Sequence, residues 1–287
     1  MRPANLKTRL FLDSGDPQET KDIMQLMGFL DGQTTNPSLV AKNPEAQKRF
    51  QENKKFKSQE IYDFYKTVIQ QFSQMMPEGS ISIEVYADDK TTGEEMFNQG
   101  KEMYTWIPNA HIKYPTNNAG LQAAEKSIQA GMRVNMTLCF TQDQAAAIYA
   151  ATKGAKKGQV FVSPFIGRLD DLNENGMDLI KNILDMYKKG DSHVEVLTAS
   201  VRSFEHFMFA LRLGSDIITA PYKILKEWAE KGMPIPDENF QYNHPELKPI
   251  PALSLDLSQD WTSFNIEHQL TTKGIQKFAQ DWNALVE

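Results

Sequence analysis

The chain has 287 residues, of which 40% are hydrophobic and 24% charged, a composition typical of a globular protein with a sizeable core. Disordered, collagen-like and disulfide-rich scaffolds are therefore excluded. The 31 Lys and Arg residues against 37 Asp and Glu give a formal net charge of −6, so no broad basic field is available to nucleic acid or an anionic membrane. Any anionic ligand must be bound by a few local cations.

Cysteine usage and the N-terminus indicate the compartment. The single cysteine, Cys139, lies in an apolar run, so the sequence offers neither a disulfide framework nor a CxxC motif. Residues 1–7 lack the apolar core of a signal peptide, and no window approaches the roughly 20 apolar residues of a membrane span. We expect a soluble, cytoplasmic protein. The histidines have no ligand-spaced companions, so we predict no metal. The sequence also lacks a Gly-rich dinucleotide fingerprint and a phosphate-binding P-loop.

Eight short β-branched or aliphatic runs alternate along the chain with longer stretches of helical periodicity. This pattern is typical of a parallel sheet whose strands are connected by helices. Apolar residues recur at the spacing of one helical face in 61–72 and again in 179–187. The shortest gap between strands, 201–215, still allows about three helical turns. The predicted strands are 9–13, 31–36, 80–86, 110–115, 133–140, 159–165, 194–200 and 216–220.

Eight alternations within about 210 residues predict a (β/α)8 TIM barrel, since a doubly wound sheet of this length usually has fewer strands. Beyond the last strand, 231–261 is rich in prolines and turn formers and precedes an amphipathic segment at 271–286. We see no linker to a second domain. The prediction is one barrel domain over residues 1–287, with 231–287 as a C-terminal arm and closing helix packed on it.

Side-chain alternation within the strands predicts a polar barrel interior. In the third strand the isoleucines and the valine share one face, so Glu84 faces inward. The same parity turns Lys113, Asn135 and Thr137 inward, and puts Asp13 on the face of Phe11. Polar groups should therefore converge inside the barrel, near the strand ends.

An acid, a lysine and a second acid inside a dry barrel each need a function or a partner. A desolvated lysine becomes a nucleophile toward a carbonyl, and the resulting Schiff base is an electron sink for carbon–carbon cleavage. Lys113 is the candidate nucleophile, with Asp13 and Glu84 as candidate general acid and base groups. Taken singly, Lys113 also fits a solvated lysine at an exposed strand end. The segment at 13–17 also fits a turn in which Asp16 is a helix N-cap.

Two arginines, Arg168 and Arg202, follow the ends of later strands. Guanidinium groups in loops at the carboxyl end of a barrel suit a phosphate, and the later strands often supply that site. From spacing alone, a pair of surface salt bridges is an equally good interpretation.

Four segments together resemble the transaldolase family: FLDSGD at 11–16, TTNPSL at 34–39, IKYP at 112–115 and SPFIGR at 163–168. The second and fourth are highly specific in combination. The resemblance covers residues 9–229 and resumes over 270–282, which is similar to the family's C-terminal helix.

The resemblance implies a barrel without metal or organic cofactor that transfers a dihydroxyacetone unit between small-molecule sugar phosphates through a lysine Schiff base. The implied reaction, from sedoheptulose 7-phosphate and glyceraldehyde 3-phosphate to fructose 6-phosphate and erythrose 4-phosphate, belongs to the pentose phosphate pathway.

The same resemblance assigns roles to residues of this chain. Lys113 matches the Schiff-base lysine and Asp13 the acid/base group for carbon–carbon cleavage. Glu84 and Thr137 match the pair that acts through a water in imine formation and hydrolysis. The implied substrate-binding residues, with the two arginines as the phosphate clamp, are Thr35, Asn36, Asn135, Ser163, Phe165, Arg168, Ser200 and Arg202.

Three residues depart from the family's usual pattern. Tyr114 stands where a small aliphatic residue is usual, Asn117 where Thr is usual, and Val201 where Phe is usual. Because they lie beside the lysine and an arginine, they leave the reaction type intact and leave the donor and acceptor sugars open. The sequence does not decide between a monomer and a homo-oligomer.

Two other functions compete with a transferase. An enzyme similar to fructose-6-phosphate aldolase uses the same lysine and releases free dihydroxyacetone, but Glu84 and Phe165 argue against it because we expect Gln and Tyr there in that group. A catalytically silent sugar-phosphate-binding barrel is disfavoured because the acid/base set beside Lys113 is retained.

Overall fold

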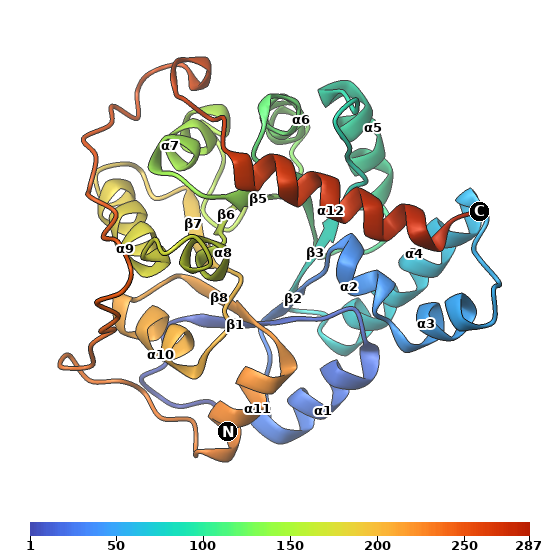
Figure 1. The fold of residues 1–287 in the computed structure, drawn as a ribbon, viewed down its shortest axis with the longest axis horizontal. Coiled ribbons are helices and arrows are strands. Elements are labelled where there is room, and N and C mark those ends of the chain that lie inside the picture. The colour runs from blue at the N-terminus through green and yellow to red at the C-terminus, as the bar shows by residue number, and fades with distance from the viewer.

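The computed structural model describes residues 1–287 and shows a closed barrel of parallel strands with helices around it (Figure 1). The strands pair in chain order from β1 to β8, and β8 pairs with β1 to close the sheet. The predicted (β/α)8 barrel is therefore confirmed. The strands are β1 Arg9–Asp13, β2 Gly32–Thr34, β3 Ser80–Glu84, β4 Ala110–Pro115, β5 Val134–Cys139, β6 Val160–Pro164, β7 Val194–Thr198 and β8 Ile217–Ala220.

Every connection between strands holds at least one helix, and the connection from β2 to β3 holds three. The apolar face predicted in 61–72 lies on the longest helix, where Ile61, Val68 and Phe72 are buried. The helices are α1 Pro17–Met27, α2 Pro37–Ala41, α3 Pro44–Gln51, α4 Ser58–Met75, α5 Gly93–Tyr104, α6 Asn118–Gln129, α7 Gln142–Ala151, α8 Ile166–Asp170, α9 Gly176–Tyr187, α10 Phe204–Leu213, α11 Tyr222–Glu230 and α12 Gln269–Leu285, with a 3-10 turn η1 at Trp261–Ser263.

Several strands end earlier than predicted, and these early ends are at the rim of the barrel. β2 stops at Thr34, two residues short of the prediction, because Pro37 begins α2 and the Asn36 side chain caps it by accepting a hydrogen bond from the Leu39 amide at 2.9 Å. β3 stops at Glu84 and β7 at Thr198, each two residues early. The chain therefore leaves the sheet just where the predicted site residues stand.

The amino-terminal half of the barrel interior is filled by side chains. The Phe161 ring stacks on the His111 ring at a centroid separation of 4.1 Å and meets Phe11 edge-on at 6.1 Å. The Arg9 guanidinium lies over the same Phe161 ring and forms an ion pair of 3.0 Å with Glu195. Because this end is plugged, only the carboxyl end of the barrel offers room for a ligand.

The C-terminal segment wraps around the barrel and then crosses its end. From Lys231 to Asp260 the chain forms no helix and no strand of the barrel, and it passes along α9 and α7. The last helix, α12, then crosses the open end of the barrel and contacts α2 and β5 (Figure 1). The C-terminus is tied back by a hydrogen bond of 2.8 Å from the Phe56 amide to the Leu285 carbonyl. None of the helices combines the length and apolar character that crossing a membrane requires.

Candidate functional site

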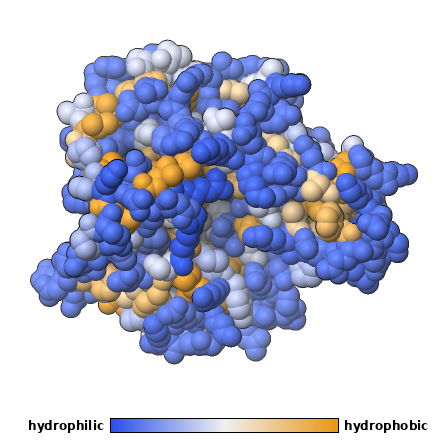
Figure 2. All heavy atoms as spheres, in the orientation of Figure 1, coloured by the Kyte–Doolittle hydropathy of each residue, from blue (hydrophilic) through white to orange (hydrophobic).

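A cavity of about 570 Å³ opens at the carboxyl end of the barrel, where ligands bind in this fold. Figure 2 shows a hollow near the middle of this largely hydrophilic face. Six of the residues predicted from the sequence line the cavity, and they come from the end of β1 and from the segments after β2, β6 and β7. They are Asp13, Asn36, Phe165, Arg168, Ser200 and Arg202.

Lys113 lies deeper, among buried groups of β3 and the end of β2. Its side-chain nitrogen is 2.9 Å from the Glu84 carboxylate and donates a hydrogen bond of 2.8 Å to the Thr35 carbonyl. Lys113 is 3% exposed and Glu84 4%, so the lysine is not the solvated group at a strand end that it resembles in isolation. The amine is held between a carboxylate and a carbonyl within the barrel.

Burial raises the pKa of Glu84 and also that of Asp13, and the nearby Lys113 charge opposes both shifts. The Asp13 carboxylate accepts a hydrogen bond of 2.6 Å from Thr34 Oγ1, which in turn lies 2.6 Å from Thr219 Oγ1. One amine thus shares its surroundings with two acids that hold protons more readily than in water. Such a set can accept and release protons during a reaction at the amine.

A hydrogen-bonded chain crosses the interior beside the lysine. Ser163 donates to the Asn135 side-chain oxygen at 2.7 Å, and the Asn135 amide donates to Ser82 Oγ at 3.0 Å. Because these residues come from β6, β5 and β3, their side chains meet across the barrel interior, as the strand parity predicts. The amide and the hydroxyls offer groups that can bind the hydroxyls of a polyol.

Thr137 stands at an irregularity of β5. The register with β6 shifts between Met136 and Cys139, and Leu138 has a left-handed φ of 58°, an uncommon conformation for a bulky side chain. The Thr137 hydroxyl is buried and has no hydrogen-bond partner within the protein. A buried polar group without a partner is unusual and marks a place where a small polar molecule is favoured.

The two arginines have different surroundings. Arg168, on α8, is half-buried, with its guanidinium 5.2 Å from the centroid of the Phe165 ring and 5.5 Å from that of Phe278. Burial lowers its pKa. Arg202 is exposed and pairs with Asp171, so one of the two does make a surface ion pair. Arg202 also packs on Gly167, where a Cβ would come 2.7 Å from its Cδ, so the glycine brings the two arginine segments together.

The sequence matches the family described as Transaldolase/Fructose-6-phosphate aldolase over residues 10–287. The chain belongs to the transaldolase/fructose-6-phosphate aldolase family. It is 34% identical over 277 residues to a probable transaldolase of Dehalococcoides mccartyi, covering 96% of this chain and 99% of that one. It is 32% identical over 279 residues to a probable transaldolase of Alkaliphilus metalliredigens, covering 97% and 100%. Among solved structures, 3-hexulose-6-phosphate synthase from Salmonella typhimurium has a TM-score of 0.49 at 13% identity, covering 78% of this chain and 95% of that one.

Several residues line the cavity of this family member without having been predicted as site residues. They come from α2, the residues just after it, and α12, and include Ser38, Lys42, Lys277, Phe278 and Asp281. Ser38 hydrogen-bonds Asp281, and Lys277 pairs with the same carboxylate at 2.6 Å, so α12 is joined to α2 over the cavity. No periodicity indicates these contacts, because the two helices are far apart in the sequence.

The departures from the family pattern lie in different places. The Tyr114 side chain is buried outside the barrel, where its hydroxyl lies 3.0 Å from Ser127 Oγ of α6. Asn117 caps α6 by accepting a hydrogen bond of 2.8 Å from the Gly120 amide. Neither residue lines the cavity at Asp13 and the arginines. Tyr114 instead contributes to packing against α6, and Asn117 to the cap of that helix.

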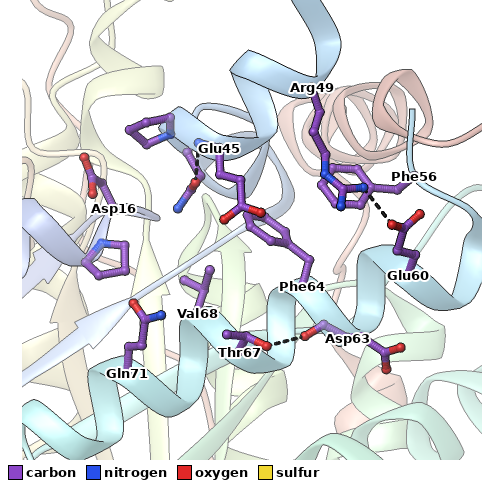
Figure 3. A pocket seen from close by; sticks show the side chains of 13 residues that line it. Asp16, Glu45, Arg49, Phe56, Glu60, Asp63, Phe64, Thr67, Val68 and Gln71 are labelled. Atoms are coloured by element: carbon purple, nitrogen blue, oxygen red, sulfur yellow. Dashed lines mark hydrogen bonds and ion pairs between the residues drawn. The ribbon is translucent and has the colours of Figure 1, made fainter. Parts of the chain in front are cut away.

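A second hollow, of about 440 Å³, lies outside the barrel between α3, α4 and the start of α1 (Figure 3). Its charged lining is mostly carboxylates, and its one arginine, Arg49, pairs with Glu60 at 2.8 Å. None of the predicted site residues lines it. An acidic hollow with its only cation paired does not suit a phosphorylated ligand.

Proposed function

We propose that the protein is a transaldolase that transfers a dihydroxyacetone unit from a ketose phosphate to an aldose phosphate through a Schiff base on Lys113. The observation that carries the proposal is the buried Lys113 amine, 2.9 Å from Glu84, below a cavity that holds Asp13 and two arginines. We propose sedoheptulose 7-phosphate and glyceraldehyde 3-phosphate as substrates, in the pentose phosphate pathway of the cytoplasm.

The first half of the proposed reaction forms the imine. The Lys113 nitrogen attacks the ketone carbon C2 of the donor, and the carbonyl oxygen takes up a proton to give a carbinolamine. Loss of that oxygen as water leaves a protonated imine. Glu84 and Thr137 are proposed to move these protons through a water, which agrees with the raised pKa of the buried Glu84 and the unpartnered Thr137 hydroxyl.

The second half breaks and remakes a carbon–carbon bond. Asp13 takes the proton of the C4 hydroxyl, the C3–C4 bond breaks, and its electron pair moves into the imine to give an enamine. An aldose phosphate leaves. The enamine carbon then attacks the aldehyde of the acceptor, Asp13 returns the proton to the new alkoxide, and hydrolysis of the imine frees Lys113.

Arg168 and Arg202 are proposed to bind the phosphate of donor and acceptor in turn. Guanidinium groups suit phosphate oxygens, and both arginines line the cavity. In this proposal a phosphate displaces Asp171 from Arg202, since the existing ion pair is exposed and contributes little. The interior hydroxyls and amides of Asn36, Asn135 and Ser163 would then hold the hydroxyls of the sugar.

The decisive experiment traps the imine with borohydride in the presence of fructose 6-phosphate and maps the modified peptide by mass spectrometry. We expect a three-carbon adduct or the full sugar adduct on Lys113, and none in Lys113→Met. An unmodified Lys113 would overturn the proposal and leave a binding role for the barrel.

A second assay separates a transferase from an aldolase. Fructose 6-phosphate is incubated with and without erythrose 4-phosphate, and sedoheptulose 7-phosphate and free dihydroxyacetone are measured. We expect turnover only with the acceptor. Release of dihydroxyacetone without acceptor at a comparable rate would assign the aldolase activity instead.

A further inference from the structure

The phenol of Tyr65, on α4 outside the barrel, reaches between β2 and β3 to the residues that hold the Lys113 amine. Its oxygen lies 2.6 Å from Thr35 Oγ1 and 3.0 Å from the Glu84 amide nitrogen. Thr35 supplies the carbonyl, and Glu84 the carboxylate, that contact the Lys113 nitrogen at 2.8 and 2.9 Å. One hydroxyl is therefore bonded to both residues that flank the amine.

The direction of each hydrogen bond in this group follows from the number of protons available. The Thr35 hydroxyl donates its single proton to the Ser82 carbonyl at 2.9 Å, so toward Tyr65 it can only accept. Tyr65 thus donates to Thr35, and its oxygen accepts from the Glu84 amide. Burial raises the pKa of Tyr65, which keeps the phenol protonated as this arrangement requires.

The early end of β2 explains why this bond is needed. The last paired residues of β2 and β3 are Thr34 and Ser82, and the chain turns into α2 at Pro37. The Glu84 amide therefore lies beyond the paired part of the two strands, and the Tyr65 oxygen is its acceptor in place of a strand carbonyl. The Thr35 carbonyl stays available to Lys113.

We propose that Tyr65 is a positioning residue for the Lys113 amine, acting through Thr35 and Glu84 and without touching the lysine. The inference rests on the proposed function of Lys113. The Tyr65 ring is held edge-on by Trp106 of the loop after α5 and by Trp282 of α12, with centroids 5.9 and 5.8 Å away. Removing the hydroxyl alone should therefore leave the ring in place.

The test is Tyr65→Phe, with Tyr62→Phe as the matched control. Tyr62 lies on the same helix, packs on the same Trp282 at 5.4 Å, and its hydroxyl accepts from Gln99 outside the barrel. For Tyr65→Phe we expect the rate constant of borohydride trapping at saturating fructose 6-phosphate, and kcat, to fall about 10- to 100-fold, with KM changed much less. The amplitude of trapping should stay complete, and Tyr62→Phe should match the unmodified chain.

The outcomes separate positioning from stability. A wild-type rate constant in Tyr65→Phe overturns the proposal, and so does a reduced trapping amplitude with an unchanged rate constant, because that combination reports lost folded protein only. Thr35→Val should lower the rate constant similarly, and the double variant should lose no more than the larger single loss. Additive losses would show that the two hydroxyls act independently, against the proposal.

A further measurement keeps this inference separate from the proposed function. Reductive methylation of Lys113 by formaldehyde and cyanoborohydride, scored by peptide mass, requires no activity toward sugar phosphates. We expect the pH dependence of Lys113 labelling to shift in Tyr65→Phe and not in Tyr62→Phe. Superimposable profiles would contradict a positioning role, whereas failure of fructose 6-phosphate to label the unmodified chain would contradict only the proposed function.

Discussion

Asp13 and Glu84 are two acids with the same direction of pKa shift and different neighbours. Glu84 pairs directly with Lys113, whereas Asp13 lines the cavity and is hydrogen-bonded to Thr34. In the proposed reaction, Glu84 would therefore transfer protons at the nitrogen, and Asp13 at a hydroxyl of the sugar. The two carboxyls should therefore separate in their mutational effects.

Asp13→Asn should retain imine formation while losing carbon–carbon cleavage. An amide cannot take the proton of the C4 hydroxyl, so kcat should fall by about 10²- to 10⁴-fold, while borohydride still labels Lys113 with the uncleaved sugar. Glu84→Gln is the comparison, since it should slow the labelling itself. Loss of labelling in Asp13→Asn would contradict this division of roles.

His111 is a buried residue of the barrel interior that serves the plugged end. Its Nδ1 lies 2.7 Å from Ser80 Oγ and its Nε2 2.9 Å from the Gly158 carbonyl, so a neutral ring satisfies both contacts, with Nε2 donating. Burial lowers the pKa of His111 to about 3. The unfolded chain, with an ordinary histidine pKa near 6.5, binds this proton more readily.

His111 should therefore make the protein less stable toward acid. The free energy of unfolding that the neutral, buried His111 contributes is fully present above pH 6.5 and is lost as the pH falls toward 3. In His111→Gln the slope of unfolding free energy against pH, from urea unfolding at pH 4 to 6, should be shallower by up to about 1.4 kcal/mol per pH unit. His244→Gln is the control, because Glu246 and Glu205 raise the pKa of His244. Folded and unfolded chains both bind this proton below the unfolded pKa, so the slope at pH 4 to 6 should change little. Equal slopes in His111→Gln and the unmodified chain would contradict the prediction.

At the scale of elements, α5 approaches β4 closely because Gly100 leaves room for Tyr114. A Cβ on Gly100 would lie 2.0 Å from the Tyr114 hydroxyl oxygen and 2.9 Å from Ile112 Cγ2. The large Tyr114 ring fills the space that the missing side chain of Gly100 leaves, so the ring and the glycine form a matched pair. The contact fixes the distance between the helix and the strand that carries Lys113.

Gly100→Ala should destabilise the protein by about 1–3 kcal/mol from overpacking, although alanine favours a helix by about 1 kcal/mol over glycine. Asn98→Ala, on an exposed position of the same helix, should have little effect. Adding Tyr114→Val to Gly100→Ala should remove the closer of the two clashes, so the double variant should lose less than the sum of the single losses in urea unfolding. Strict additivity would show that the two residues do not meet.

The elements of the site were predictable to different degrees. The inward faces of β3, β4 and β5 follow from an alternation of two residues, a local property that puts Glu84, Lys113 and Asn135 inside. The end of β2 was predicted two residues late, because Pro37 and the Asn36 cap stop the strand while the β-branched run continues. Because β2 ends early, the Glu84 amide donates its hydrogen bond to the Tyr65 hydroxyl rather than to a carbonyl of β2.

At the scale of the whole molecule, side chains of two outer helices hold the C-terminal arm. Asn182 of α9 donates to the Ile250 carbonyl at 2.8 Å, and Gln142 of α7 both donates to the Pro251 carbonyl and accepts from the Leu253 amide. These bonds hold residues 250–253 of an arm that has no helix or barrel strand between Lys231 and Asp260.

The variant Gln142→Ala with Asn182→Ala should loosen the arm around residues 250–253 without unfolding the barrel, while the bonds at Lys248 and Tyr242 persist. Thermolysin should cut within 231–260 several-fold faster than in the unmodified chain, while the barrel fragment stays intact, because local opening now costs less. Lys248→Ala is the matched control, since Lys248 contacts the barrel through backbone bonds to Asn173 and Asn175 that the substitution retains. An unchanged cleavage rate in the double variant would show that these side chains do not hold the arm.

The amino-acid sequence by itself determined the alternation of strands and helices, the inward parity of Lys113 and Glu84, and, through four motifs, the family. These are local properties, since each depends on residues close together along the chain. Only the tertiary structure decided that α12 lies over the cavity with Lys277 and Asp281, and that the Tyr65 hydroxyl reaches Thr35 and Glu84 from outside the barrel. Such contacts join residues distant in sequence, and they depend on how whole helices pack rather than on any periodicity within one segment.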